Sequence, residues 1–423
     1  MSATNQSPRR AFWLILSLLS AFSMWYYVAN VWSIGQSARF SDLYAPWWGA
    51  HELLLHGRDP YSPGVTRETQ TVIYGAPVAT SRPGDAAELA GGFAYPIYVV
   101  FLLWPTVYEA FPAIERAFVF LFVALTLASL WLWLSALKWR LPAADLGIVA
   151  VFMFGSFPVL QGLKLENLSL LAAFLVAAAL ASLAAEQFTI AGLLLAAATI
   201  KPQFVILLIP WLAVWTMGDW QRRRGLAWSF SAAMSALILG GEVLAPGWVR
   251  RFLTIVRAYQ QYTYGHSLLD VWFSSRIAPV VAAVLVLVLL LRCWQGRSHP
   301  AHSSAFFLVS SWVLAATLIV IPTLEPHAQL LLLPGFLFLL RYGSRICRLG
   351  KIPRIFLTSA WLLLGWAWIV SVGMMLATIW IPAETLRRFW ELPLYTSPLI
   401  PFGIFVVLGY LLTKKTEFPP LAV

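Results

Sequence analysis

The chain has 423 residues, of which 60% are apolar and only 11% are charged. A soluble protein of this size would expose too much apolar surface to water, so the composition excludes a soluble globular fold. The net charge of +11 does not indicate nucleic-acid binding, because the basic residues are concentrated between the apolar segments. The sequence predicts an all-α polytopic membrane protein with a single membrane domain over residues 1–423.

About twelve transmembrane helices are predicted, since one crossing needs about 17–25 apolar residues. The first segment lacks a small-residue cleavage site, so it is expected to remain as a helix rather than be removed as a signal peptide. Residues 95–111 are apolar too, but Pro96 and Pro105 within them and Pro112 just after them predict a helix that lies in the outer interface or re-enters from it. The predicted crossings are 11–32, 116–137, 144–161, 168–185, 187–200, 203–217, 227–244, 277–292, 304–322, 328–341, 355–379 and 398–413.

The basic clusters all fall on one side of this topology. The positive-inside rule places that side, with both termini, in the cytoplasm of a cell whose inner (plasma) membrane holds the protein. A first outer loop over 33–115, with juxtamembrane helices, and a second over 245–276 then face outward. The clusters are Arg9 with Arg10, Lys138 with Arg140, Arg222 to Arg224, Arg292 with Arg297, the run 341–354, and Lys414 with Lys415.

Asp42 directly follows the first predicted helix, at the start of the long outer loop. Phe40 and Tyr44 flank it and would hold it at the depth of the lipid headgroups. A carboxylate in this place can act as a general base where an acceptor hydroxyl meets a donor. An ordinary solvated loop aspartate is the alternative.

Lys201 lies in Ile200-Lys201-Pro202, between two apolar runs. A lysine at the centre of a membrane helix costs about 2.5–3.5 kcal/mol, so such residues are rare and mostly functional. Its ammonium would hold a phosphate as a point charge. The alternative is that the side chain snorkels to the outer interface.

Three further cations are candidates for the same phosphate. His327 begins a Leu-rich helix, where the helix dipole favours an anion. His266 lies in the second outer loop, and Arg276 lies at the outer end of the next helix. Polar caps for the two histidines and a membrane anchor for Arg276 are the alternatives. His51 and His56, in the first loop, are predicted to be surface residues.

Motifs of several other classes are missing from the chain. It has no Gly-rich phosphate loop and no Gly-x-Ser-x-Gly elbow, and we expect no metal-ligand pair at helical spacing. The two cysteines, Cys293 and Cys347, imply no disulfide framework. Chains of intramembrane carboxylates, typical of proton-coupled transporters, are missing as well.

Several segments together resemble glycosyltransferase family 87, whose members use polyprenyl-phosphate sugars and have the GT-C fold. At one turn the chain departs from the family's Gly-Gln-x-Asn, because Lys164-Leu165-Glu166-Asn167 keeps only the asparagine. The similar segments follow the family's order along the chain: Asp42-Leu43-Tyr44 with Gly57-Arg58-Asp59-Pro60-Tyr61, Phe93-Ala94-Tyr95-Pro96, Ala191-Gly192 with Ile200-Lys201-Pro202, His266-Ser267-Leu268, and Pro326-His327.

The resemblance implies inverting transfer of a hexose, with mannose expected, from a polyprenyl-phosphate donor to a lipid-linked or glycan acceptor. Such a reaction belongs to glycolipid biosynthesis of the cell envelope and would occur on the periplasmic or extracellular face. It implies Asp42 as the catalytic base, and neither a metal nor a cofactor. It implies phosphate contacts from Lys201, His327, His266 and Arg276, and substrate contacts from Tyr44, Arg58, Asp59, Tyr61, Tyr95 and Asn167.

Two alternatives remain open from the residues alone. A transporter or flippase of lipid-linked sugars would also need cations for a phosphate. A ligase- or polymerase-like transferase would use a diphosphate donor instead.

Overall fold

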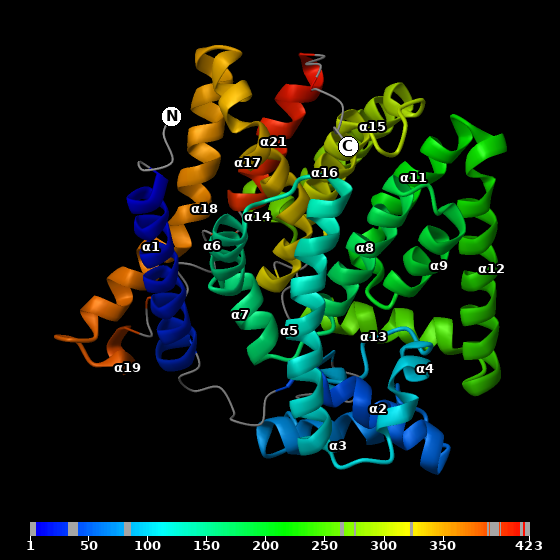
Figure 1. Ribbon diagram of the computed structural model, residues 1–423. Coiled ribbons are helices and arrows are strands. Elements are labelled where there is room, and N and C mark those ends of the chain that lie inside the picture. The colour runs from blue at the N-terminus through cyan, green and yellow to red at the C-terminus, as the bar shows by residue number, and fades with distance from the viewer. Residues whose placement is uncertain are drawn as a thin grey trace.

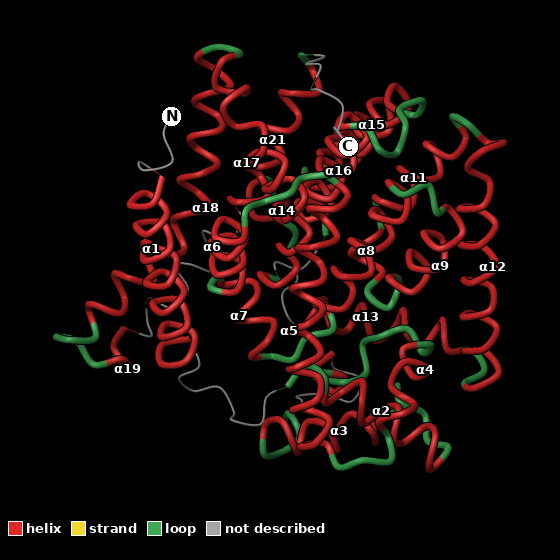
Figure 2. Tube along the Cα trace, in the orientation of Figure 1, coloured by secondary structure: helices red, strands yellow, loops and turns green. Residues whose placement is uncertain are grey.

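The computed structural model describes residues 6–32, 41–79, 86–262, 266–274, 276–321, 325–386, 389, 397, 399–414 and 418. Within these residues every regular element is helical (Figure 2). The described part of the chain therefore confirms the prediction of an all-α protein.

The first half of the chain alternates long apolar helices with short helical turns. Proline stands in the first turn of α5, α7 and α10, where its missing N–H costs no intrahelical bond. The elements are α1 (Gln6–Tyr27), η2 (Val28–Trp32), α2 (Tyr44–His56), α3 (Pro63–Tyr74), η3 (Ala86–Leu89), α4 (Val99–Leu103), η4 (Trp104–Thr106), α5 (Phe111–Ala136), α6 (Ala143–Phe154), α7 (Phe157–Lys164), α8 (Ser169–Ala184), α9 (Phe188–Ala198), α10 (Pro202–Val205) and α11 (Leu208–Met217).

The second half continues in the same way. Its elements are α12 (Trp220–Leu244), α13 (Trp248–Tyr262), α14 (Leu268–Trp272), α15 (Ala278–Gly296), α16 (Ser304–Val320), η5 (Pro326–Leu332), α17 (Leu333–Arg348), α18 (Lys351–Ala377), α19 (Ala383–Leu386) and α21 (Leu399–Thr413).

Six helical stretches are long and apolar enough to cross a membrane, or seven if the bent pair α6 and α7 is one span. The axes of that pair differ by 58°. Five shorter apolar helices, together with the bent pair, coincide with the remaining predicted crossings. The protein is therefore a multi-pass membrane protein, and the number of about twelve crossings stays a prediction.

The apolar segment 95–111 forms only α4 and the single turn η4. Their eight residues would extend about 12 Å at 1.5 Å per residue, which is far less than a bilayer thickness of about 30 Å. The prediction that this segment does not span the membrane as a helix is confirmed.

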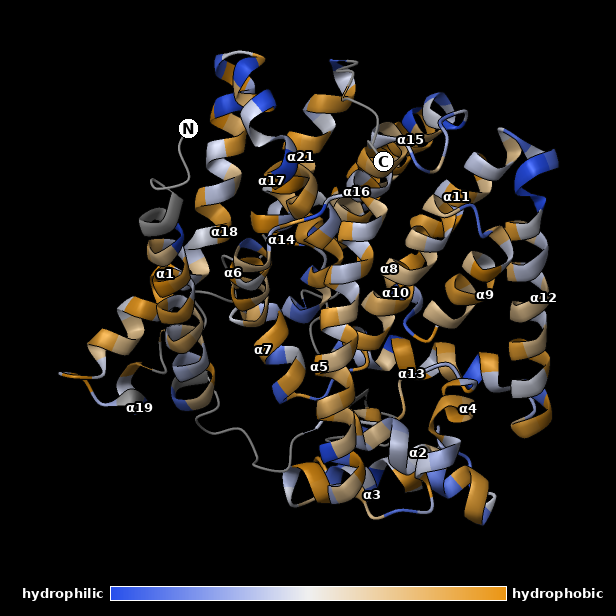
Figure 3. Ribbon diagram, in the orientation of Figure 1, coloured by the Kyte–Doolittle hydropathy of each residue, from blue (hydrophilic) through white to orange (hydrophobic). Residues whose placement is uncertain are grey.

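The connections between helices gather at two ends of the bundle (Figure 1). Figure 3 shows hydrophilic turns at the upper end, between α11 and α12, α15 and α16, and α17 and α18. At the lower end α2, α3 and α4 form a layer, and α13 runs across the bundle just above it. The turns with predicted basic clusters thus share one end, and the predicted outer loops share the other.

The second predicted outer loop is mostly the helix α13. Ile255 and Ala258 are buried on one side of this helix, whereas Arg250 and Arg257 are exposed. Such a division between apolar and basic faces is typical of a helix that lies in a membrane interface.

One basic cluster at the upper end contains a residue that holds the fold together. Arg223 is buried, and its guanidinium lies 3.8 Å from the ring centre of Trp215. It donates hydrogen bonds to the backbone carbonyls of Arg297 at 2.6 Å and His299 at 3.2 Å. Arg223 therefore joins the α11–α12 turn to the α15–α16 turn.

Small residues allow α9 to pack closely against α12. A Cβ atom at Gly192 would lie 2.6 Å from the carbonyl oxygen of Leu226 and 2.8 Å from the backbone nitrogen of Phe230. Close approach of backbones at small residues is how membrane helices gain packing energy, since lipid is as apolar as the helices themselves.

We predict that Gly192→Ala lowers the thermal stability of the detergent-solubilised protein. The added methyl group meets backbone atoms of α12, and overpacking of this kind costs about 1–3 kcal/mol. Gly147→Ala is the control, because a Cβ at this helical glycine meets nothing within 4 Å. Equal melting temperatures for the two variants would contradict close packing at Gly192.

Candidate functional site

Four segments that are distant in the sequence meet at breaks between helices. Asp42 precedes α2, Asn167 lies between α7 and α8, Lys201 lies between α9 and α10, and Glu325 with His327 lies where η5 begins. Non-helical backbone at membrane depth is tolerated only where it is buried in protein or lines a cavity. The breaks therefore bring polar groups from different parts of the chain together inside the bundle.

A chain of polar contacts connects these five side chains. Asn167 Nδ2 donates to Asp42 Oδ2 at 2.6 Å, and Lys201 Nζ donates to Asn167 Oδ1 at 2.8 Å. Lys201 Nζ lies 3.5 Å from Glu325 Oε2, and the same oxygen lies 2.9 Å from His327 Nε2. The predicted base and two of the predicted phosphate ligands are thus brought together.

Backbone contacts fix the position of Asp42. Its N–H donates to the carbonyl of Leu165 at 2.7 Å, and the neighbouring Ser41 hydroxyl donates to Glu166 Oε2 at 2.6 Å. Glu166 has a φ of 53°, the left-handed conformation that turns the chain from α7 into α8. Burial raises the pKa of the Glu166 carboxyl to about 7, against the opposing effect of Ser41. The turn that carries Asn167 therefore also holds the backbone of Asp42.

Lys201 does not snorkel to the solvent. Its side chain is only 5% exposed, and its ammonium lies 5.7 Å from the ring centre of Tyr95 in addition to contacting Asn167 and Glu325. A buried ammonium with a carboxylate, an amide oxygen and an aromatic face around it is a fixed positive charge inside the protein.

The two carboxyl groups of the site respond differently to their surroundings. Burial raises the pKa of Asp42 above its ordinary value, although His327, Asn167 and Lys201 oppose this shift. Burial would also raise the pKa of Glu325, but Lys201 and His327 outweigh it and hold that pKa well below its usual range. Glu325 is thus a permanent anion, whereas Asp42 is a carboxylate that takes up a proton more readily than usual.

His327 keeps one nitrogen available. Its Nε2 contacts Glu325, while its Nδ1 is buried and has no hydrogen-bond partner among the described residues. A buried polar atom without a partner costs free energy, so such atoms are rare in folded proteins unless a ligand reaches them.

Four of the six residues predicted to contact the substrate lie in the layer of α2, α3 and α4 rather than in the polar chain. Tyr44 stacks on Trp48, and Arg58 pairs with Glu52 and Glu68. The two pairs of Arg58 hold α2 and α3 together, since Glu52 belongs to α2 and Glu68 to α3. Phe40, the predicted partner of Tyr44 in anchoring Asp42, lies outside the described residues.

The other two of these four residues, Asp59 and Tyr61, join this layer to neighbouring segments. Asp59 pairs with Arg251 of α13 at 3.2 Å, and the Tyr61 hydroxyl donates to the carbonyl of Tyr95 at 2.8 Å. These residues form the wall beside the polar chain, and their contact with a substrate remains a prediction.

His266 and Arg276 stand apart from the polar chain. Both side chains are exposed, and the described residues show no hydrogen bond or ion pair that joins either to Asp42, Lys201 or His327. Their predicted role at the phosphate therefore gains no geometric support.

Two residues of the site were not assigned a role from the sequence. Glu325 is an isolated acid in an apolar region, so the rule that selected Lys201 would have selected it as well. Tyr259 of α13 is the second. Burial raises its pKa well above the usual range, and the charges of Glu325 and Asp42 raise it further.

An apolar groove lies next to Lys201. It has a volume of about 640 Å³ and is enclosed by α4, α8, α9 and α12, with Ile200 among its lining residues. The hydroxyl of Tyr98, another lining residue, donates to the carbonyl of Thr199 at 2.9 Å. The groove thus reaches Ile200, the residue that precedes Lys201 in the chain.

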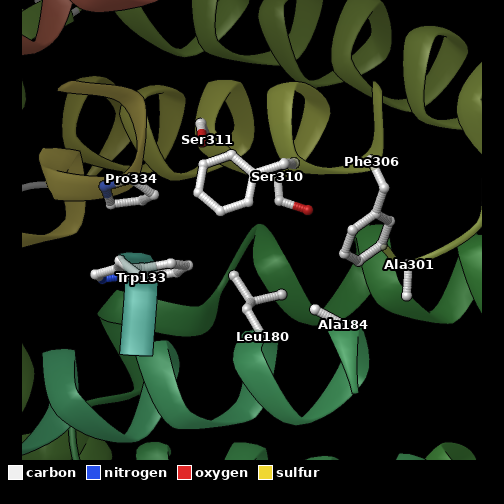
Figure 4. Close-up of a pocket in the computed structure, with 9 residues that line it drawn as sticks. Trp133, Leu180, Ala184, Ala301, Phe306, Ser310, Ser311 and Pro334 are labelled. Carbon is white, nitrogen blue, oxygen red and sulfur yellow. The ribbon is translucent and has the colours of Figure 1, made fainter. Parts of the chain in front are cut away.

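A second cavity is far too small for a substrate. Figure 4 shows Trp133, Leu180, Phe306 and Pro334 around it, on the helices α5, α8, α16 and α17. Its volume is about 10 Å³, which is about the space that one water molecule occupies. We regard it as a packing gap.

Comparison with known proteins gives one match. The sequence model of glycosyltransferase family 87 matches residues 93–322, a range that contains Asn167 and Lys201, while Asp42, Glu325 and His327 lie outside it. No curated protein and no solved structure matches the chain. Because the family match covers more than half of the 423 residues, the chain belongs to glycosyltransferase family 87.

Proposed function

We propose that this glycosyltransferase moves a hexose, with mannose expected, from a polyprenyl-phosphate donor to a hydroxyl of a lipid-linked or glycan acceptor, with inversion. The observation that carries the proposal is the polar chain from Asp42 to His327 beside an apolar groove. A donor with a phosphate, a sugar and an isoprenoid tail needs cations, a base and an apolar channel side by side.

Asp42 is proposed as the general base. Asn167 occupies its Oδ2, so Oδ1 is the oxygen assigned to the proton of the acceptor hydroxyl. As the proton moves to Asp42, the hydroxyl oxygen attacks the anomeric carbon from the face opposite the phosphate. The bond from that carbon to the phosphate oxygen breaks, and its electron pair leaves with the lipid phosphate.

Lys201 and His327 are proposed to stabilise that leaving group. The donor phosphate is a diester with one negative charge, and it becomes a monoester with two charges as the sugar leaves. Preorganised cations at the place where charge develops act strongly, because the buried site excludes water. Glu325 contacts both cations and is proposed to position them.

The proposed orientation follows from the two ends of the bundle. The basic turns at the upper end in Figure 3 would face the cytoplasm, with both termini, by the positive-inside rule. The layer of α2, α3 and α4 would then lie on the periplasmic or extracellular side of the inner (plasma) membrane, beside the site.

A defined-donor assay tests the proposal. The purified protein is given radiolabelled hexose on a polyprenyl monophosphate or a polyprenyl diphosphate, in vesicles with acceptor lipid extract. Glycosidic product from the monophosphate alone is expected. Product from the diphosphate alone would favour the ligase-like alternative, and movement of donor across vesicles without a new glycosidic bond would favour the flippase.

We predict that Asp42→Asn reduces turnover by about 10²–10⁴-fold, because the amide cannot accept the hydroxyl proton. The protein should still fold, since the backbone contact to Leu165 and the volume of the side chain are kept. Asp145→Asn, at an exposed pair with Arg10, is the matched control and should retain activity. Near-normal turnover of Asp42→Asn with intact donor would remove Asp42 as the base.

We predict that Lys201→Ala raises the KM for the donor and lowers kcat by on the order of 10²-fold, since it removes a charge from the leaving phosphate. The readout is initial rate over a range of donor concentrations. Lys164→Ala removes an exposed lysine three residues before Asn167 and should leave the rates unchanged. Identical kinetics for both variants would exclude a phosphate-binding role for Lys201.

We predict that kcat/KM falls on the acidic side with a midpoint above 3.8, the ordinary pKa of an aspartate, because burial raises the pKa of Asp42. Asn167→Ala removes a hydrogen bond that favours the carboxylate, so the midpoint should move to still higher pH. Asn30→Ala, which alters an exposed asparagine of the first helix, should not move it. An unchanged or lower midpoint in Asn167→Ala would contradict the coupling of Asn167 to Asp42.

A further inference from the structure

A second group of polar side chains lies at the other end of α2 from Asp42. His51, Glu52 and His56 each offer one ligand atom, and these atoms all lie within 4.8 Å of one another. Glu52 and His56 are four residues apart, so they share one face of the helix. The sequence analysis expected no metal-ligand pair at helical spacing, and this pair shows that expectation to be wrong.

The distances suit a tetrahedral metal ion. Nδ1 of His51 and Nδ1 of His56 each lie 3.2 Å from Glu52 Oε1. Bonds of about 2.0–2.1 Å from zinc to nitrogen and oxygen, at tetrahedral angles, separate neighbouring ligand atoms by about 3.3 Å. Three ligand atoms around one ion form a triangle. Two of its three sides, from Glu52 Oε1 to each Nδ1, already have nearly this length.

The contact between His51 and Glu52 is also a hydrogen bond, and at 3.2 Å both contacts lie at the long end of the hydrogen-bond range. A charge-assisted N–H···O bond is about 2.7–2.9 Å long, and both contacts to Glu52 are longer. Both histidines also direct the same ring nitrogen, Nδ1, at the same carboxylate oxygen. Convergence of two ring nitrogens on one oxygen is the arrangement expected when all three atoms surround a cation.

The surroundings hold the three ligands in place. Arg58 donates to the other oxygen of Glu52 at 2.6 Å, so Oε1 remains for an ion. The ring of His51 stacks on Trp48, with centroids 4.9 Å apart and planes 10° from parallel. Outer contacts of this kind orient ligands in known metal sites and strengthen binding.

We propose that His51, Glu52 and His56 bind a divalent transition-metal ion of the zinc type, with water in the fourth position. The side chain of Glu52 is 3% exposed, whereas that of His56 is 51% exposed, so an ion can enter from the outer side. Two imidazoles and one carboxylate form a donor set that prefers zinc to calcium or magnesium.

The ion would serve the structure of the outer layer rather than the reaction. Glu52 follows Asp42 by 10 residues, which corresponds to about 15 Å along the helix. An ion here would join the last two turns of α2, beside Arg58 and Asp59, which pair with α3 and α13. The proposal does not depend on the sugar, donor or acceptor of the reaction.

Zinc binding by the full-length protein tests the proposal. The protein is purified in detergent through a tag without histidines, treated with chelator and desalted. It is then titrated with Zn²⁺ by calorimetry and with Co²⁺ by visible absorption. We expect one ion per chain, a d–d spectrum of a tetrahedral cobalt site, and a higher melting temperature with Zn²⁺.

His51→Ala and His56→Ala should each lower the Zn²⁺ affinity at least about tenfold and abolish the gain in melting temperature. His302→Ala is the control, because it removes a histidine of similar exposure that pairs with Glu186 near the opposite end of the bundle. Wild-type affinity in the double variant His51→Ala/His56→Ala would overturn the proposal. So would the lack of Zn²⁺ binding at micromolar concentration in the wild-type protein.

Discussion

The fold depends on one buried ammonium. Lys201 is 5% exposed, and it is tolerable in a membrane protein only because Glu325 and Asn167 surround its charge. Those partners come from breaks in other parts of the chain, so α7 to α10 and η5 must assemble around Lys201 for its charge to be neutralised. Asp42 joins the same assembly through Asn167. Removal of Lys201 or Glu325 would leave its partner as a less compensated buried charge, so the polar chain contributes to the stability of the fold as well as to function.

Sequence analysis found much of this site because isolated charges are conspicuous in an apolar chain. Asp42, Lys201 and His327 stood out for that reason, and the structure brings them together. Hydropathy likewise located the long helices, and the prolines in and after 95–111 predicted that this segment does not span the membrane as one. The sequence could not say which helix breaks meet in space. The pairing of Lys201 with Glu325 was therefore missed.

The same limitation explains the residues that lie elsewhere. His266 was chosen for its place in an outer loop, but loops at one end of a bundle can be far apart across its width. Conversely, His51 and His56 were expected to be ordinary surface residues, since both lie on an amphipathic stretch of the first loop. Their ring nitrogens converge only because Glu52 is buried beneath them and Trp48 orients one ring. Both outcomes are decided by packing between segments, which periodicity does not reveal.

The long sequence separation within the polar chain has a consequence for how the protein is made. Glu325 follows Lys201 by about 120 residues, which a ribosome adds in on the order of 10 s at about 5–20 residues per second. During that interval the inserted chain holds an ammonium whose carboxylate partner does not yet exist. The ammonium of Lys201 therefore gains its carboxylate partner only after every helix up to α16 has been synthesised.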